Sequence, residues 1–472
     1  MSLELSVVVL AAGMGTRMKS ALPKVMHKVA GKPMVNHVID TAAHLKAAKT
    51  MVVVGPDMPD LIKAVAPHPT FEQTDRLGTA HAVLAAKDGL KGLTGNVLVL
   101  YADSPLFTAE TLARLVAARE EKDHAVAVLG FRPEDPTGYG RLVTDQNGNL
   151  TAIVEDKECN DAQRQINFCN SGVMCFKAED MITTLGAIDN ANAKGEYYLT
   201  DAVEVAQKNG QSCAAVEVDE AETLGVNSRT QLAVAEAILQ DRLREAAMAA
   251  GATLVDPASV FLSADTKLGR DVIVEPNVVF GPGVTVGDNV LIKAFSHLES
   301  CVVGNGANIG PYARLRPGAE IGAGARVGNF VEIKKAVVED GAKVNHLSYI
   351  GDARVGTKAN IGAGTITCNY DGFRKQHTDI GAGAFIGSNS SLVAPVEIGD
   401  GAIVGAGSTI TGKVEADALT LTRAERIEKR GWAAKFREKM RELLVRRNGP
   451  AVRDTLLWFG LLISSWSRSR FL

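Results

Sequence analysis

The sequence predicts two successive folds, an α/β domain with a mostly parallel sheet over residues 1–227 and a parallel β-helix over residues 252–422. In the first part, short β-branched runs alternate with helical patterns, which is typical of a parallel sheet covered by helices. In the second part, one apolar residue recurs every six positions, a period that fits neither an α-helix nor an alternating strand. A helical segment over 228–251 is expected to join the two domains, and a basic stretch over 423–472 follows them.

The composition, with 46% hydrophobic and 22% charged residues, is that of a soluble globular protein. A net charge of −3 gives no reason to expect nucleic acid as the main partner. The six cysteines form no CxxC pair, which favours free thiols in a reducing cytoplasm. The apolar run 6–12 lacks a preceding basic region and is interpreted as a buried strand rather than a signal peptide.

Three buried strands and three helices are expected in the first domain. The strands are predicted at 7–10, 50–54 and 97–100, and the helices at 35–45, 81–90 and 109–122. In the joining segment, Ser228 is a candidate N-cap and Gly251 a candidate stop. Ligands of parallel sheets bind at the carboxyl ends of the strands, so functional residues are expected there.

The six-residue period covers 24 apolar positions, beginning at Leu262 and ending at Ile410. Five-residue steps separate its phases, and Gly, Asn or Asp usually follows the apolar residue. Stacked coils of such a solenoid bury a continuous apolar column that no single coil could bury. The segment 367–379 interrupts the period and is expected to loop out of the stack, which makes it a candidate functional region.

A glycine-rich turn follows the first predicted strand, with Gly13 and Gly15 ahead of Arg17 and Lys24. Glycines let backbone N–H groups approach a phosphate chain, and the two cations supply charge. The turn is neither a GxGxxG nor a Walker motif. On spacing alone, a plain tight turn remains an alternative.

Further motifs make the turn more specific. The string from Leu10 to Met18 with Leu22-Pro23-Lys24 is similar to the signature of sugar-phosphate nucleotidyltransferases. In order, it is joined by Gln73, 77–79, 101–105, 138–141, Glu155, 170–172, 195–198 with 200–201, and 225–227. With the repeats behind them, residues 5–436 resemble the bacterial family of bifunctional N-acetylglucosamine-1-phosphate uridyltransferases and glucosamine-1-phosphate acetyltransferases.

The resemblance implies a Rossmann-like nucleotidyltransferase domain followed by a left-handed β-helix of hexapeptide repeats. It also implies an enzyme that acetylates glucosamine-1-phosphate with acetyl-CoA and then transfers UMP from UTP. The product, UDP-N-acetylglucosamine, would supply peptidoglycan and lipopolysaccharide precursors, and pyrophosphate would be released. The resemblance further implies a homotrimer with acetyltransferase sites between subunits. The cysteine pattern and the interpretation of the N-terminus as a strand predict a cytoplasmic protein.

The resemblance also implies roles for single residues of the first domain. The uracil ring would be bound by Ala12, Gln73 and Gly78, and the triphosphate by Gly13, Arg17 and Lys24. The sugar would be bound by Thr79, Gly140, Glu155 and Asn170. Three further residues would complete the nucleotide-sugar site: Leu10, Ala11 and Tyr101. Asp103 and Asn227 would bind Mg²⁺, which prefers oxygen ligands. A turn or cap role is the alternative for Asp103, and Ala102 stands where the family often has glycine.

His346 interrupts the repeats where a small polar corner residue would be usual. Acetyl transfer to an amine needs a base, and the usual histidine pKa suits that role. The resemblance implies that His346 is the base and that Glu332 orients it. It further implies a glucosamine-1-phosphate set of Arg316, Lys334, Tyr349 and Asn360, and an acetyl-CoA set of Ala363, Asn369, Tyr370, Ser388, Ala406 and Arg423.

Other interpretations remain open. His346 could be a surface corner residue, or could join His297 and His377 in a zinc site, although no spacing supports the metal. The chain could be a single-activity nucleotidyltransferase with a structural β-helix, or a scaffold that binds nucleotide sugars. A basic helix is expected at 424–445, and the apolar segment 455–466 is too short to span a membrane. We interpret residues 448–472, which include this segment, as an extension without function, so membrane contact is not expected. Packing on the oligomer or contact with a membrane surface is the alternative.

Overall fold

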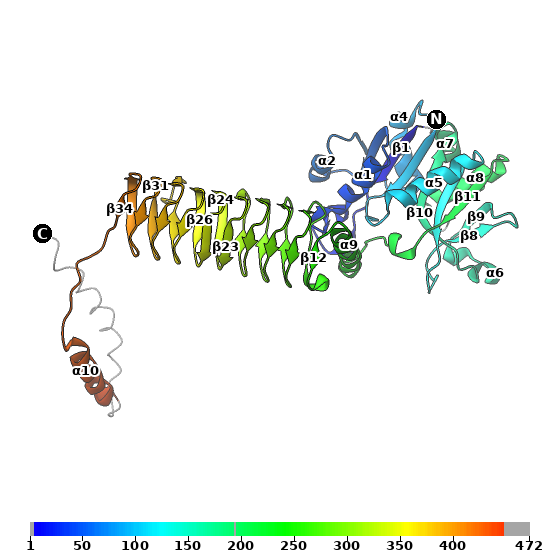
Figure 1. Cartoon of the computed structure of the whole chain (residues 1–472). Helices are drawn as coiled ribbons and strands as arrows, with labels where there is room; N and C mark the ends of the chain where they lie inside the picture. The colour runs from blue at the N-terminus through cyan, green and yellow to red at the C-terminus, as the bar shows by residue number, and fades with distance from the viewer. Residues whose placement is uncertain (1–3, 193–194, 448–472) are drawn as a thin grey trace. The chain divides into compact units, whose positions relative to one another are not determined.

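The N-terminal sheet is built around β1 (Leu5–Leu10), which pairs in parallel with β4 (Lys49–Val54) and with β6 (Asn96–Tyr101). The computed structural model describes residues 4–192 and 195–447 of the chain (Figure 1). The main strands lie in the order β11-β7-β10-β6-β1-β4-β5, and β10 (Cys169–Lys177) runs antiparallel to both neighbours. The three strands predicted from the sequence are therefore present in one mostly parallel sheet.

The remaining strands and the helices of this domain have the following bounds. The other strands are β2 (Lys28–Val29), β3 (Lys32–Pro33), β5 (Thr70–Glu72), β7 (Val126–Phe131), β8 (Arg141–Thr144), β9 (Leu150–Val154) and β11 (Cys213–Glu217). The helices are α1 (Met34–His44), α2 (Pro59–Val65), α3 (Thr79–Ala85), α4 (Lys87–Leu90), α5 (Ala109–Glu121), α6 (Asp161–Arg164), α7 (Ala178–Gly186) and α8 (Ala202–Lys208).

Both faces of the sheet are buried, because successive strand residues point to opposite sides. Val8 and its neighbours on that face pack against residues of α3, α7 and α8. Val7 and Val9 point to the other face and pack against α1, α2 and α5. Near-continuous apolar strands are what a sheet covered on both faces requires.

The single helix predicted over 81–90 is wrong. The chain forms α3 and then α4, with Ala86 between them at φ −87° and ψ 13°. The break brings Gly89 against the sheet, where a Cβ would lie 2.6 Å from the Met51 sulfur and from the Phe71 ring. The helix is therefore interrupted at the point where Gly89 packs closely against the sheet.

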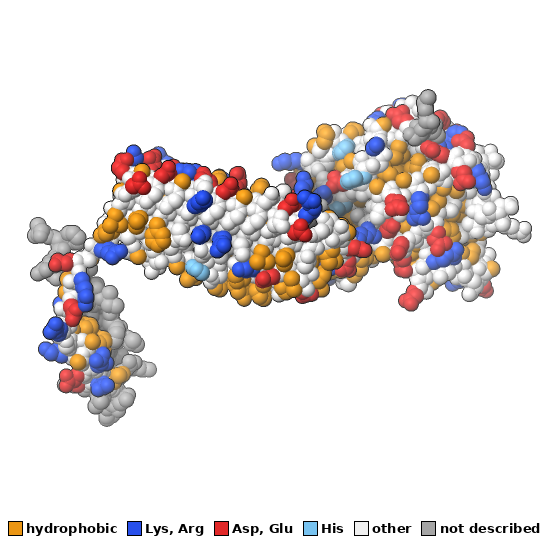
Figure 2. Space-filling model, viewed as in Figure 1, with side chains coloured by type: hydrophobic (Ala, Val, Ile, Leu, Met, Phe, Trp, Pro, Cys, Tyr) orange, Lys and Arg blue, Asp and Glu red, His pale blue; other side chains and the backbone are white. Residues whose placement is uncertain are grey.

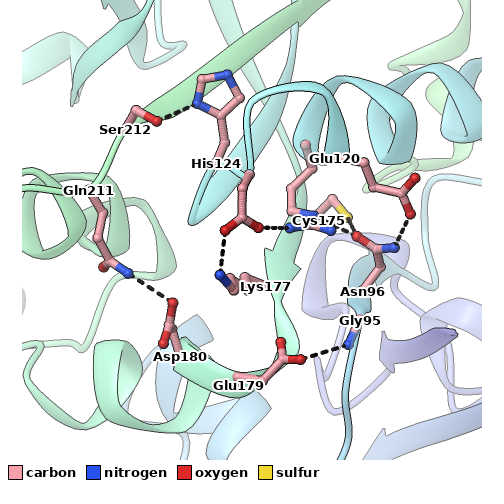
Figure 3. A network of polar contacts seen from close by, with 12 residues as sticks. Gly95, Asn96, Glu120, His124, Cys175, Lys177, Glu179, Asp180, Gln211 and Ser212 are labelled. Carbon is pink, nitrogen blue, oxygen red and sulfur yellow. Dashed lines mark hydrogen bonds and ion pairs between the residues drawn. The ribbon is translucent and has the colours of Figure 1, made fainter. Parts of the chain in front are cut away.

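A buried polar network lies at the start of β6 (Figure 3). The Arg119 side chain, only 1% exposed, donates to Asn96 Oδ1 at 2.6 Å and to Asp123 Oδ1 at 3.1 Å. Lys177 donates to the second oxygen of Asp123 at 2.6 Å. A buried guanidinium is stabilised only when such acceptors surround it. The network lies at the opposite end of β6 from the carboxyl edge, so we interpret it as structural.

Helix α9 (Arg229–Ala249) lies between the sheet and the first coil of the repeats, where the sequence predicts a helical segment. The Ser228 side chain caps it by accepting from the Gln231 N–H at 3.2 Å, and Gly251 follows at φ +104°. The Gln240 amide both donates to and accepts from the Leu262 backbone, at 2.6 and 2.9 Å. This helix therefore covers the first coil of the repeats and satisfies part of its open end.

The β-helix has three faces of parallel strands. One face holds β12 (Thr253–Leu254), β14 (Ile273–Val274), β17 (Leu291–Ile292), β20 (Asn308–Ile309), β23 (Arg326–Asn329), β25 (Lys343–His346), β27 (Asn360–Ile361), β30 (Phe385–Ile386), β32 (Ile403–Val404) and β34 (Leu419–Thr420). The second and third hold β13 (Lys267–Leu268), β15 (Val279–Phe280), β16 (Thr285–Val286), β18 (His297–Leu298), β19 (Cys301–Val303), β21 (Arg314–Leu315), β22 (Ala319–Ile321), β28 (Ile366–Cys368) and β29 (Thr378–Ile380). Four longer strands run along both of these faces: β24 (Glu332–Val338), β26 (Tyr349–Val355), β31 (Ser391–Ile398) and β33 (Thr409–Val414).

The apolar residues of the six-residue period form the core, as predicted. All 24 positions are buried except Leu268, which is partly buried. A second inward position, two residues earlier and usually Ala, Val or Ser, fills the space between them, as at Ala325 before Val327. Figure 2 shows that Lys, Arg, Asp and Glu side chains are interspersed over the visible surface, in keeping with a net charge of −3.

The predicted loop over 367–379 is too long at both ends. Thr367 belongs to β28 and is 1% exposed, and Thr378 opens β29 and is fully buried. Only 369–377 leaves the stack, because Thr367 Oγ1 accepts from the Gly351 N–H at 2.8 Å and so extends the ladder.

Residues 1–421 form one compact unit, and the described residues from 422 to 447 belong to a second one, the C-terminal unit. Its helix α10 (Trp432–Arg447) begins eight residues later than the predicted start at 424, after Gly431 at φ +71°. The predicted apolar extension 455–466 lies outside the described residues. Among the described helices, none combines the length and apolar character needed to cross a bilayer.

Candidate functional site

The turn after β1 contains two glycines, Gly13 and Gly15, which have different structural roles. A Cβ at Gly13 would meet no atom within 4 Å, so this backbone is accessible to a ligand. Gly15 lies at φ +61°, and a Cβ there would lie 2.4 Å from the Cβ of Lys24. Glycine is therefore required at position 15 so that the Lys24 side chain can cross the turn.

Lys24 meets two oxygen-bearing side chains at the carboxyl edge of the sheet. Its ammonium pairs with Asp103 Oδ2 and donates to Asn227 Oδ1 at 2.9 Å. Asp103 follows β6, and the Val226 N–H donates to the Asp103 carbonyl at 2.8 Å, which brings Asn227 alongside. Because both oxygens contact one ammonium, they lie close enough to share one cation. An Asp and an Asn oxygen also suit Mg²⁺ chemically, so the pair fits the predicted metal.

The predicted segment that follows β5 also meets the turn. Gln73, only 5% exposed, follows β5, and its backbone N–H donates to the Val54 carbonyl at 2.8 Å. Arg76, which sequence reasoning missed, donates from Nε to the Ala12 carbonyl at 3.1 Å. This contact ties the segment expected to bind uracil to the turn after β1.

The residues expected to hold the sugar are brought together near Tyr101. The Tyr101 hydroxyl is hydrogen-bonded to Thr79, and the charges of Asp103 and Glu155 both act on it. Burial, followed by the Asp103 charge, raises the Tyr101 pKa far above its usual value, so the phenol is neutral.

The other predicted sugar residues lie on strands β8 to β10 or beside them. The Asn170 N–H donates to the Gly140 carbonyl at 2.8 Å. A Cβ at Gly140 would lie 3.6 Å from Glu155 Oε1, so the three positions form one cluster.

The structure gives His346 a different partner from the expected one. His346 Nδ1 lies 2.8 Å from Asn329 Oδ1, and the two residues are paired in register on β25 and β23. Glu332 instead accepts from Arg316 Nη1 at 2.7 Å and pairs in register with Tyr349. Glu332 lies on the face that adjoins that of His346, and its role in orienting the imidazole stays a prediction.

A second cluster lies on the adjoining face. Asn369 is 8% exposed, and its Nδ2 lies 3.4 Å from the Tyr349 hydroxyl and 2.5 Å from Asp352 Oδ2. Lys375, which the sequence analysis does not single out, lies beside Lys334. A hydrogen bond with Lys334, and then its like charge, lower the Lys375 pKa. Two adjacent ammonium groups favour an anion such as a phosphate.

A groove with a volume of about 630 Å³ opens beside this cluster, at the base of the loop 369–377. Its lining includes Lys335, Asp352, Arg354 and Lys375. Tyr370 lies on the same loop, 61% exposed, and its hydroxyl donates to the Gly372 carbonyl at 2.5 Å.

Three residues of the predicted acetyl-CoA set are stacked at one corner. Ala363, Ser388 and Ala406 each follow a strand of the same face by the same number of residues. The Asn389 N–H donates to the Ala363 carbonyl at 2.7 Å and the Gly407 N–H to the Ser388 carbonyl at 2.8 Å, which joins the coils. Arg423, in contrast, belongs to the C-terminal unit, so its membership of the set stays a prediction.

The zinc interpretation receives no support. His297 lies on β18, His346 on β25 and His377 on the loop 369–377. Within residues 4–192 and 195–447, no three His, Cys, Asp or Glu side chains are grouped to hold a metal ion.

Comparisons with known proteins cover nearly the whole chain. Residues 7–166 match the MobA-like NTP transferase domain, and 265–299, 300–335 and 377–412 match bacterial transferase hexapeptide repeats. The bifunctional protein GlmU of Paramagnetospirillum magneticum is 61% identical over 92% of this chain and 97% of the relative. Those of Azorhizobium caulinodans and Rhodospirillum rubrum are also 61% identical, over 92% of this chain and 97% and 98% of the relatives.

These matches favour two transferase activities over the single-activity interpretation, since the relatives are named bifunctional and both domain types are present. They also agree with a nucleotidyltransferase domain followed by a left-handed β-helix. The chain belongs to the family of bifunctional GlmU proteins.

Proposed function

We propose that this chain acetylates glucosamine-1-phosphate with acetyl-CoA and then joins the product to UMP from UTP, releasing pyrophosphate. One observation carries the proposal: the chain places two separate polar clusters, around Asp103 and around His346, on the two domains of a bifunctional transferase family. The product would be UDP-N-acetylglucosamine for cell-wall and lipopolysaccharide precursors, made in the cytoplasm.

The uridyl transfer needs no protein nucleophile. A phosphate oxygen of the acetylated sugar attacks the α-phosphorus of UTP in line, and the bond to pyrophosphate breaks. Arg17 and Lys24 would neutralise the triphosphate, and Tyr101 with Thr79 would position the sugar. Asp103 and Asn227 would hold Mg²⁺, which supplies charge neutralisation at the phosphates when it is bound.

The acetyl transfer would use His346 as the general base. The sugar amine attacks the thioester carbonyl, the C–N bond forms, and the C–S bond breaks after an oxyanion intermediate. His346 Nε2 takes the amine proton and returns it to the CoA thiolate. Asn329 Oδ1 would accept from Nδ1–H and so fix the tautomer in which Nε2 is free to act.

Arg316 and Lys334, on the face that adjoins His346, would hold the sugar phosphate. Lys375 adds a further positive charge beside Lys334. Guanidinium and ammonium groups are common phosphate partners.

We further propose a homotrimer. Phe295, Tyr312 and Phe330 stack on successive coils with ring centroids 5.0 Å apart and rings within 14° of parallel. All three are about half exposed, and Leu347, the residue after His346, continues the row at 61% exposure. An apolar row of this length favours burial against another chain. Light scattering should give three times the mass of the chain; a monomer at micromolar concentration would contradict this.

One assay tests the two activities separately. Purified protein is given glucosamine-1-phosphate, acetyl-CoA, UTP and Mg²⁺, and free thiol and pyrophosphate are measured independently. Asp103→Ala should abolish pyrophosphate release and keep thiol release. His346→Ala should abolish thiol release, and it should keep pyrophosphate release when N-acetylglucosamine-1-phosphate is supplied as the acceptor. Pyrophosphate at the parent rate from Asp103→Ala would refute the metal assignment, and thiol at the parent rate from His346→Ala would refute the base.

A further inference from the structure

The amide of Gln73 is held in one orientation by two hydrogen bonds from the same nitrogen. Nε2 donates to the Gly78 carbonyl at 3.1 Å and lies 3.3 Å from Nδ1 of His81. Both amide protons are thereby used, and the side chain is 5% exposed. Within the described part of the chain, no residue donates to Oε1, so this oxygen is available to a ligand.

The opposite orientation of the amide is disfavoured by the same two neighbours. If the amide flipped, Oε1 would face the Gly78 carbonyl oxygen, which is also an acceptor. It would also face Nδ1 of His81, which accepts when the ring proton is on Nε2. A flip would therefore exchange two hydrogen bonds for two repulsive contacts at a buried position.

His81 is itself fixed by its surroundings. Its ring stacks on that of Tyr197, with centroids 6.4 Å apart and 29° between planes. The Tyr197 backbone is bonded to this segment on both sides, to the Leu77 carbonyl at 2.7 Å and the Ala80 N–H at 3.0 Å. Gly78, at φ +117°, allows the close approach, since a Cβ there would lie 2.4 Å from the Tyr197 carbonyl.

We infer that His81 is a positioning residue that makes the nucleotidyltransferase site select uracil over cytosine. The inference rests on the proposed function, in which Gln73 contacts the base. Uracil presents an N3–H donor, which the fixed Oε1 of Gln73 can accept. Cytosine presents a bare N3 acceptor at the same position, which Oε1 would repel. Without His81, the amide could turn and present Nε2 to cytosine instead.

The test measures pyrophosphate release from UTP and from CTP with N-acetylglucosamine-1-phosphate as acceptor. His81→Ala should lower the ratio of kcat/KM for UTP to that for CTP by about tenfold or more, through a higher KM for UTP and a lower KM for CTP. His81→Asn should restore much of the ratio, because its amide oxygen can accept in place of Nδ1. His44→Ala, an exposed histidine bonded to the Asp40 carbonyl, serves as the matched control.

A variant with an aromatic ring that lacks nitrogen tests whether His81 acts by accepting a hydrogen bond or only by packing. His81→Phe keeps an aromatic ring against Tyr197 and removes the acceptor, so it should lose selectivity as His81→Ala does. If His81→Phe and His81→Ala both keep the parent ratio, the inference is wrong. If the parent protein releases no pyrophosphate from UTP, the proposed function fails instead, which is a different result.

Discussion

Asp201 offers a stability prediction that can be worked from the structure. Burial, and then the negative charge of Glu204, raises the Asp201 pKa to about 6. In the unfolded chain the pKa of an aspartate is ~3.9. The difference of roughly 2 between the two pKa values corresponds to at most ~3 kcal/mol of folding free energy. Because Asp201 is only partly buried, we expect about half of this. A raised carboxyl pKa favours the folded state at low pH, and that advantage is lost as the pH rises from about 4 through 6.

Asp201→Asn removes the charge that the folded state disfavours. We expect it to raise the melting temperature of the nucleotidyltransferase domain by about 3–6 °C at pH 7.5 and by little at pH 4. Glu204→Gln should give a smaller gain in the same direction, since Glu204 contributes the second cause of the shift. Calorimetric melts of the full chain across pH 4–8 measure both. A change of equal size at every pH would refute the reasoning.

Three other predictions concern the two sites and the β-helix core. Lys24→Met should strengthen Mn²⁺ binding without nucleotide by about tenfold, measured by electron paramagnetic resonance, because the ammonium no longer competes for Asp103; unchanged affinity would contradict this. Asn329→Ala should slow thiol release by about tenfold or more and leave pyrophosphate release unchanged, whereas equal thiol rates would show that Asn329 does not orient His346. Ile333→Ala, at a fully buried site, should cost roughly 2–5 kcal/mol, while the exposed Val337→Ala changes stability little; similar melting temperatures for both would refute the core assignment.

The period of the β-helix was predictable because its physical cause is local to each coil. Every coil must turn one apolar side chain inward, so the pattern at Leu262, Ile333 or Ile410 is visible without knowing what lies above or below. The second inward position was missed because Ala325 and Ser348 are small or polar and do not stand out in a sequence. The boundaries of the loop 369–377 were also missed, since Thr367 stays in the stack through a hydrogen bond that hydrophobicity does not report.

The motifs expected to form the nucleotide site could be recognised in the sequence, but the contacts between their residues could not. Lys24 and Asp103 are far apart in sequence, and their contact depends on the parallel order of β1 and β6. Arg76 carries no pattern of its own, because a single arginine in a loop has many possible partners. Its role follows only from the position of the Ala12 carbonyl.

The partner of His346, by contrast, could have been predicted from the repeat itself. A coil spans eighteen residues, or seventeen where a five-residue step occurs, and such a step lies between Ile333 and Val338. The residue stacked beside His346 must therefore be seventeen positions earlier, and that residue is Asn329. The same count pairs Glu332 with Tyr349 on a different face. Register in a solenoid is thus set by the lengths of its steps, and it decides which side chains are stacked on one face.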